Sequence, residues 1–197
     1  MAERVTRGTG LLEGFLARRR AAMARRRLRQ VLVDRILDVG CGSYPFFLMG
    51  FPAREKVGVD RVVRDGRAGP TGVSLVHHDF EHDPSLPFAD DAFDAVTMLA
   101  VFEHVEPTAL TPLLADIRRV LAPGGTLVLT TPAGWTGPLL HLLALLRLVS
   151  SEEIEEHKDA YDLDRIRDHL RGAGFADDRL AFGRFELGAN LWATARK

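Results

Sequence analysis

A short apolar run that ends in two glycines constrains the fold of this chain more than any other feature. Residues 36–42 read Ile-Leu-Asp-Val-Gly-Cys-Gly, with an acid at the centre and one residue between the glycines. The run predicts a strand buried on both faces of a parallel sheet. Glycines directly after it let the backbone turn sharply and let a ligand approach the main chain. Because a strand ending in Gly-x-Gly also begins many dinucleotide-binding sites, the loop alone does not identify the ligand.

Further apolar runs alternate with helical patterns along the chain. Strands are expected at residues 56–60, 74–78, 93–99, 126–131, 179–182 and 191–195. A helix is expected up to Leu121, followed by a turn at residues 123–125, and another over residues 163–171. Asp60 ends the second strand, where an acid accepts hydrogen bonds from ribose hydroxyls in nucleotide-binding α/β folds.

Four blocks, in order, resemble the class I S-adenosylmethionine-dependent methyltransferases, in the small-molecule, methyltransferase type 11-like group with an Asp-x-Gly-Cys-Gly loop. The blocks are LDVGCG at 37–42, VGVD at 57–60, LPFADDAFDAVTMLAVFEHV at 86–105 and RVLAPGGTLVLTTP at 119–132. The resemblance implies an α/β, Rossmann-like fold. Its sheet has seven mostly parallel strands with the last antiparallel, helices cover both faces, and the cofactor crosses the carboxyl ends of strands one to four.

The resemblance also implies S-adenosylmethionine as cofactor and S-adenosylhomocysteine as product. Gly40 and Gly42 pass the methionine end, Asp38 lies near the ammonium, and Asp60 takes both ribose hydroxyls. Asp79 accepts from the adenine amino group. The implied cofactor-binding residues are Asp38, Gly40, Cys41, Gly42, Asp60, Asp79, Phe80, Leu99 and Ala100.

The loop departs from the family pattern at its third glycine. Tyr44 and Pro45 stand where Gly-x-Gly-x-Gly would continue, which changes the contacts at the methionine end. Proline at position 45 also disfavours the rival interpretation, an NAD-dependent oxidoreductase, whose motif needs a glycine there. A third interpretation is a non-catalytic protein that binds the cofactor and serves as an interaction partner.

Composition fits one methyltransferase domain over residues 1–197. A length of 197 residues with 46% hydrophobic residues supports a sizeable core, and a net charge of −1 disfavours a nucleic-acid partner. The single cysteine, Cys41, excludes an internal disulfide and suits the cytoplasm. No stretch reaches the about 18 apolar residues of a membrane span. No metal site is expected, because His77 and His78 are adjacent on a strand and point to opposite faces.

Two segments lie outside the four blocks. Residues 1–34 carry two runs of three arginines and predict a basic helix, either a solvated face or an attraction to an anionic substrate, an acidic partner or a membrane surface. Residues 132–161 are too long for a plain connection and contain seven leucines between positions 139 and 148. We expect a helical lid after strand five there, with a dimer contact or an interfacial helix as alternatives.

The expected reaction is methylation of a small-molecule acceptor, first of all at oxygen, in secondary metabolism or cell-surface sugar modification. His104, just beyond strand four, is placed to remove the acceptor proton or contact the substrate; alternatively it starts a helix. His157 and Tyr161 are second catalytic candidates. The aromatic residues Tyr44, Phe46 and Phe47 near the glycine loop favour an acceptor with an apolar or ring portion.

Overall fold

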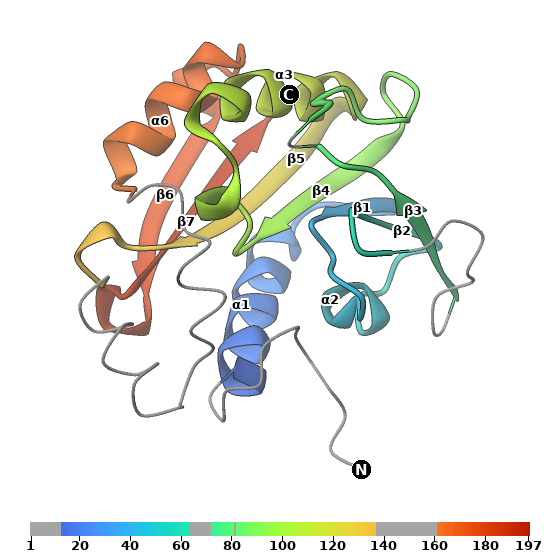
Figure 1. Ribbon diagram of the computed structural model, residues 1–197, viewed down its shortest axis with the longest axis horizontal. Coiled ribbons are helices and arrows are strands. Elements are labelled where there is room, and N and C mark those ends of the chain that lie inside the picture. Colours follow the sequence, from blue (N-terminus) through green and yellow to red (C-terminus); the bar gives the residue numbers. More distant parts are fainter. Residues whose placement is uncertain (1–12, 64–71, 81, 137–160) are drawn as a thin grey trace.

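A computed structural model of the chain describes residues 13–63, 72–80, 82–136 and 161–197, which form one seven-stranded sheet in the order β3-β2-β1-β4-β5-β7-β6 (Figure 1). The strands are β1 (Arg35–Val39), β2 (Glu55–Asp60), β3 (Val73–His77), β4 (Phe93–Leu99), β5 (Leu121–Pro132), β6 (Leu180–Phe185) and β7 (Asn190–Arg196). Each expected strand is present, and the ends agree to within three residues except at β5, which begins five residues earlier than expected.

The strand directions confirm the predicted sheet. β1 pairs in parallel with β2 and β4, and the pairs β2–β3 and β4–β5 are also parallel. β7 runs antiparallel to both β5 and β6. The order reverses between β1 and β4, because the chain adds β2 and β3 on one side of β1 and then returns to the other. In open α/β sheets, ligands bind at the carboxyl ends of the strands beside such a switch point.

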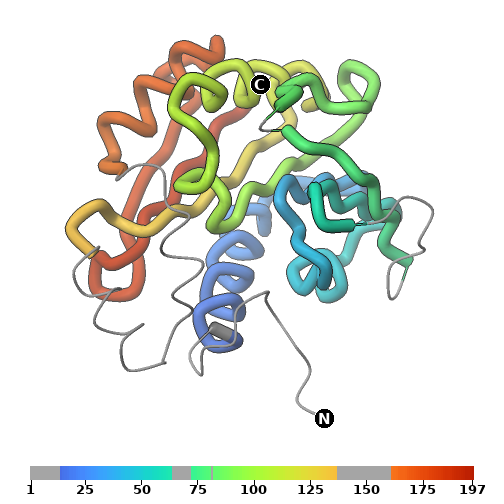
Figure 2. Tube along the Cα trace, viewed as in Figure 1, coloured from blue at the N-terminus to red at the C-terminus, as the bar shows by residue number. Residues whose placement is uncertain are grey.

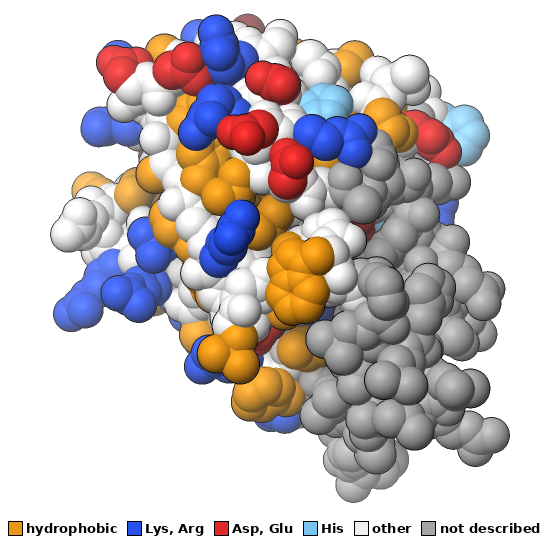
Figure 3. All heavy atoms as spheres, turned by 90° about the vertical axis from the view of Figure 1, so that its left-hand side faces the viewer, with side chains coloured by type: hydrophobic (Ala, Val, Ile, Leu, Met, Phe, Trp, Pro, Cys, Tyr) orange, Lys and Arg blue, Asp and Glu red, His pale blue; other side chains and the backbone are white. Residues whose placement is uncertain are grey.

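Helices cover both faces of the sheet, with α1 (Glu13–Leu28) and α2 (Phe46–Met49) below it and α3 (Pro107–Val120) and α6 (Leu163–Gly172) above it in Figure 1. Residues of β1 alternate between these layers: Ile36 packs in the cluster with α1, while Leu37 and Val39 pack in the cluster with α3 and α6. Such alternation follows from the two-residue period of a strand. Charged side chains of both signs crowd the outer surface of the face shown in Figure 3, toward the top of the view.

The N-terminal helix lies against β4 and β5, although these strands are far from it in the sequence (Figure 2). Ala21, Ala24 and Leu28 are buried at helical spacing. The guanidinium of Arg27 lies 3.7 Å from the ring centroid of Trp192 on β7. The expected basic helix is thus confirmed for its described part: it packs an apolar stripe on the sheet and leaves Arg18, Arg19, Arg25 and Arg26 exposed.

Two expectations about local structure are corrected. The turn expected at residues 123–125 lies inside β5, which already begins at Leu121. Leu121 pairs with Phe93 of β4, and the pairing register between β4 and β5 shifts between Phe93 and Ala95. Phe47 does not lie on an open surface beside the glycine loop. It is 4% exposed and packs against Phe51 in the core between α1, α2 and the sheet. A phenylalanine on a one-turn helix reaches the nearest apolar layer, and local sequence does not reveal which side that layer lies on.

The lid expected at residues 132–161 lies mostly outside the described residues, which include only its two ends. At those ends, Ala133 forms an isolated bridge with Tyr161. No helix in the described part of the chain is long and apolar enough to cross a membrane.

Candidate active site

The glycine loop turns directly after β1. Gly40 and Gly42 have φ values of +76° and +67°, in the left-handed region that favours glycine. The Gly40 N–H donates to the carbonyl of Val59, 2.8 Å away, which ties the loop to β2. A Cβ at position 40 would lie 2.3 Å from a methyl carbon of Val101, whereas one at position 42 would meet no atom within 4 Å. Gly40 therefore packs closely against the chain after β4, and Gly42 faces open space.

Asp60, at the carboxyl end of β2, is held by this loop. Its Oδ2 accepts from the Gly42 N–H at 2.8 Å, and its Oδ1 accepts from the Val62 N–H at 3.0 Å. The residue is only 3% exposed. A carboxylate offers about four acceptor positions, and these two backbone donors fix its orientation. The predicted neighbourhood of the glycine loop and Asp60 is present.

Asp38 is the second buried acid of the site. It pairs in register with Thr97 of β4, whose hydroxyl donates to the Asp38 carboxylate over 2.5 Å. The pKa of Asp38 is raised to about 7, mainly by burial; the hydrogen bond from Thr97 opposes the rise, and the negative charge of Asp60 adds to it. Asp38 therefore titrates near neutral pH, where a neighbouring positive charge would favour its ionised form.

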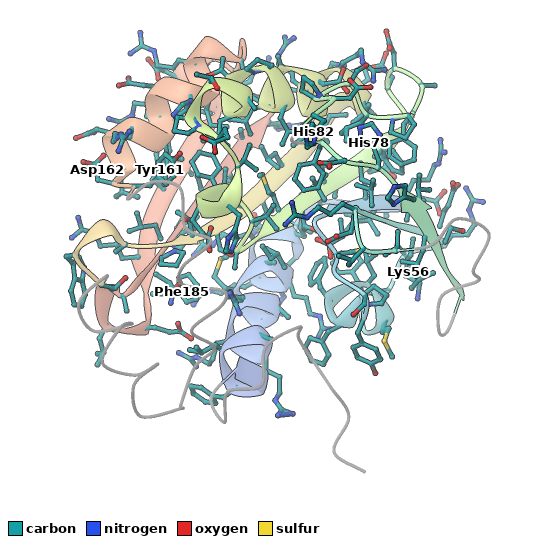
Figure 4. All side chains as sticks on the ribbon, viewed as in Figure 1. Lys56, His78, His82, Tyr161, Asp162 and Phe185 are labelled. Atoms are coloured by element: carbon teal, nitrogen blue, oxygen red, sulfur yellow. The ribbon has the colours of Figure 1, made fainter. Side chains whose placement is uncertain are left out.

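Asp79 and Phe80 follow β3, next to the end of β2. Asp60 pairs with His77, so that the chain beyond β3 continues alongside the acid. The His82 Nδ1 lies 2.9 Å from the Asp79 Oδ2, within hydrogen-bond distance. Phe80 is buried in the core. His78 and His82, labelled in Figure 4, contact Asp83 and Asp79 respectively. Among the described residues, no group of three or more His, Cys, Asp or Glu could hold a metal ion.

The chain bends sharply after β4. Ala100 has a φ of +54°, which is uncommon for a residue with a Cβ. Its N–H donates to the carbonyl oxygen and the hydroxyl of Thr130, at 3.0 and 3.1 Å. Leu99, partly buried, pairs with Thr130 on β5. Strained backbone that is fixed by its surroundings is frequent at functional sites.

His104 ends a short 3₁₀ helix, η2 (Phe102–His104), that follows this bend. Its N–H donates to the carbonyl of Val101 over 2.9 Å, and its ring is partly buried. Tyr161, labelled before α6 in Figure 4, is 1% exposed and packs edge-on against Phe102 with ring centroids 4.7 Å apart. Tyr161 thus supports the turn that carries His104. His157, the other candidate, lies outside the described residues.

Three supporting residues were not predicted. Thr97 reaches Asp38 across 59 residues, Thr130 holds the bend at Ala100, and Val101 fills the space above Gly40. Cys41 lies in the loop, as predicted. Its Sγ occupies the space beside Gly58, 2.6 Å from the position that a Cβ at residue 58 would take. Each of these contacts depends on strand pairing, for which the sequence carries no local signal.

The residues around the loop fit an S-adenosyl compound. The loop offers open space at Gly42, a fixed buried carboxylate at Asp60 suits a ribose diol, and Asp38 suits an ammonium group. All three lie at the carboxyl ends of β1 and β2, beside the switch point of the sheet.

Comparison with known proteins agrees with this geometry. A family model described as a methyltransferase domain matches residues 12–180. The chain is 38% identical over 106 residues to an uncharacterised methyltransferase of Mycobacterium sp. (strain JLS), an alignment that covers 52% of this chain and 40% of that protein. It is 36% identical over 175 residues to a demethylmenaquinone methyltransferase of Clavibacter sepedonicus, covering 77% of this chain and 69% of the relative.

A third relative is a 23S rRNA (guanine(748)-N(1))-methyltransferase of Streptomyces fradiae, with 31% identity over 192 residues, covering 90% of this chain and 62% of that protein. A solved structure of a possible histamine N-methyltransferase from Thermotoga maritima shares the fold, with a TM-score of 0.67, 18% identity, and coverage of 90% of this chain and 88% of that one. The chain therefore belongs to the methyltransferase domain family, within the class I S-adenosylmethionine-dependent methyltransferases.

Proposed function

We propose that this protein transfers the methyl group of S-adenosylmethionine to an oxygen atom of a small-molecule acceptor with an apolar or ring portion, in the cytoplasm. The observation that carries the proposal is Asp60, fixed by the N–H groups of Gly42 and Val62 beside a glycine loop with left-handed φ values. Such a carboxylate meets a ribose diol without reorganising. Because the Asp60 carboxylate is already oriented before the ligand binds, binding costs little conformational entropy.

In this proposal the bound cofactor supplies an electrophilic methyl group on a sulfonium that is already a good leaving group. Asp60 would accept from the ribose hydroxyls, Asp38 would lie near the ammonium, and Asp79 would accept from the adenine amino group. Gly40, Cys41 and Gly42 line the methionine end of the compound. The Phe80 backbone N–H would serve a ring nitrogen of the adenine, and Leu99 and Ala100 would pack near that ring or the reacting face.

His104 takes the acceptor proton. A hydroxyl is a weak nucleophile until its proton is removed, and an imidazole with a pKa near neutral is suited to that step. The turn that carries His104 is fixed from two sides, by Thr130 at Ala100 and by Tyr161 at Phe102. We assign Tyr161 a positioning role on this ground.

The nature of the acceptor is supported by chemistry and by one relative. The Clavibacter sepedonicus relative, whose alignment covers 77% of this chain, is named for demethylmenaquinone, which supports a small-molecule acceptor without supporting oxygen as the methylated atom. A second candidate function is methylation of RNA, which the Streptomyces fradiae relative and the exposed arginines of α1 favour. The net charge of −1 supplies no global attraction to a polyanion, and we therefore place the small molecule first.

The cofactor assignment is tested with Asp60→Asn. Loss of one charge-assisted acceptor, worth about 1.5–3 kcal/mol, weakens S-adenosylmethionine by about ten- to a hundredfold in calorimetric titration. Asp94→Asn is the matched control, because Asp94 also accepts from two backbone N–H groups, those of Asp34 and Arg35 at 2.9 and 2.8 Å, but near the amino end of β4. Equal affinity for both variants would place the cofactor elsewhere.

The reaction is tested by release of S-adenosylhomocysteine with three probes: a short-chain demethylmenaquinone, catechol, and a ribosomal RNA hairpin. Turnover with catechol supports transfer to oxygen. Turnover with the demethylmenaquinone alone assigns the methyl group to a ring carbon of a small-molecule acceptor and overturns transfer to oxygen, and turnover with RNA alone selects the second candidate. His104→Ala lowers turnover of the active probe tenfold or more while S-adenosylmethionine affinity stays within a few-fold. Unchanged turnover removes His104 from the mechanism. If S-adenosylmethionine binds but no probe yields S-adenosylhomocysteine, the result favours the third interpretation, a non-catalytic protein that binds the cofactor.

A further inference from the structure

Apolar side chains are exposed together where β5 ends and β7 begins. The short helix η3 (Gly134–Thr136) follows β5 and carries Trp135, which is 60% exposed. The turn η5 (Glu186–Gly188) precedes β7 and carries Leu187, at 105% of its reference exposure. The Trp135 indole N–H donates to the carbonyl of Gly188 over 3.2 Å, so the two elements form one surface.

Leu187 is held outward by its backbone. Leu187 and the preceding Glu186 both have positive φ values, +57° and +53°. Left-handed conformations cost about 1–2 kcal/mol for residues with a side chain, and a leucine has no polar group to offset that cost. The hydrogen bond from the Asn190 side chain to Glu186 holds the turn. A strained turn that presents a leucine to solvent points to a ligand that covers it.

Arginines flank this turn on two sides. The Arg19 side chain of α1 lies 3.6 Å from the Glu186 carboxylate. The Arg184 side chain passes Gly188, with its Cδ 4.0 Å from the position of a Cβ there, and its residue is exposed. Phe15, one helical turn before Arg19 on the same side of α1, is 56% exposed. In Figure 3, hydrophobic side chains gather in the lower part of this face with basic side chains around them.

We propose that Phe15, Trp135 and Leu187, with Arg19 and Arg184, form a docking surface for an anionic lipid bilayer. Tryptophan is favoured at a membrane interface because its ring is apolar and its N–H is polar. Phenylalanine and leucine enter the acyl boundary, and arginines attract acidic headgroups. The apolar centre distinguishes this surface from one built for a polyanion in water, where a fully exposed leucine gains nothing.

The surface lies at the edge of the sheet that carries the active site. Pro132 at the end of β5 pairs with Asn190 at the start of β7, so η3 and η5 stand at the same edge as the carboxyl ends of β1 and β4. A bilayer bound there would lie against the same edge of the sheet as the candidate active site. The proposal holds for any acceptor and is independent of the proposed reaction.

Vesicle binding tests the proposal without an activity assay. Trp192→Phe leaves Trp135 as the single tryptophan, since the chain has two. Its emission is recorded with vesicles of equal phosphatidylglycerol and phosphatidylcholine, and with phosphatidylcholine alone, at low salt. We expect a blue shift and co-flotation with the anionic vesicles, weakened by added salt. The absence of both with anionic vesicles overturns the proposal.

Matched variants separate the surface from general stickiness. Leu187→Ser lowers vesicle partition at least fivefold, and folding is retained because the Leu187 side chain is fully exposed. Leu32→Ser is the control, since Leu32 is 94% exposed near the amino end of β1, at the opposite edge of the sheet. Arg184→Gln weakens binding about fivefold, while Arg54→Gln, a charge at the opposite edge that is 69% exposed, leaves it unchanged.

Three further results would overturn the proposal. Equal partition of Leu187→Ser and Leu32→Ser shows that this turn does not enter the lipid. A blue shift of Trp135 with a structured RNA and none with vesicles assigns the surface to nucleic acid. Self-association in sedimentation that Leu187→Ser abolishes, without vesicle binding, assigns the surface to a second copy of the chain.

Discussion

Replacing Asp38 by asparagine should change how the stability of this protein depends on pH. Asp38 is 5% exposed, and burial raises its pKa from the ordinary value of 3.8 to about 7, while the Thr97 hydrogen bond only partly opposes the rise. The folded protein therefore holds this proton more tightly than the unfolded chain does. The resulting stability is fully present below pH 3.8 and is lost as the pH rises through about 7.

The size of the effect follows from the two pKa values. One pKa unit corresponds to about 1.4 kcal/mol, so the interval between 3.8 and about 7 amounts to about 4 kcal/mol of unfolding free energy. Asparagine does not ionise and lacks this dependence. It keeps a carbonyl oxygen that can accept from Thr97. Relative to Asp38→Asn, the wild type should lose up to about 4 kcal/mol between about pH 4 and pH 8.

Urea unfolding followed by circular dichroism, at half-unit steps between pH 4.5 and pH 8, measures this difference. Asp178→Asn serves as the control, because Asp178 is exposed in the short helix before β6 and its replacement should leave the pH profile parallel to that of the wild type. If the free-energy difference between wild type and Asp38→Asn is flat over this range, Asp38 is ionised throughout and the argument from burial is refuted.

The remaining predictions concern backbone and ion-pair positions, and all are read by denaturant unfolding. Gly40→Ala should lower the free energy of unfolding by about 2–4 kcal/mol, because the new Cβ would lie 2.3 Å from a Val101 methyl carbon and the backbone φ is +76°. Gly42→Ala should lower it by only about 1–2 kcal/mol, because its Cβ would meet no atom within 4 Å and only the left-handed backbone is strained. Equal losses would contradict the close contact, and Val101→Ala should recover part of the Gly40→Ala loss. Arg119→Gln should cost about 2–4 kcal/mol, since its guanidinium donates to two carboxylates and two backbone carbonyls. Arg167→Gln should cost about 1 kcal/mol or less, because Arg167 makes one exposed ion pair with Asp164 and one contact with the Phe182 ring, 5.0 Å from its centroid. Similar losses for the two arginine variants would refute a special role for Arg119.

The sequence predicted the strands well because they are short apolar runs, several of which are closed by glycine, proline or an acid. The switch from strand to loop at Gly40 and the acid at Asp60 are likewise local: a left-handed φ requires glycine, and an acid after a buried strand meets solvent or ligand. The wrong prediction for Phe47 has the opposite origin. Whether an aromatic side chain near a loop faces a ligand or the core depends on which layer covers it, here α1.

What the sequence determined by itself is the order of elements, the glycine turn and the positions of the acids, because steric limits and hydrophobic periodicity act on neighbouring residues. Only the tertiary structure decided that Thr97 donates to Asp38, that Val101 covers Gly40, and that Trp135 meets the turn at Gly188. Each contact joins residues about 50 to 60 positions apart. Parallel pairing and sheet order fix such contacts, and no local pattern encodes them.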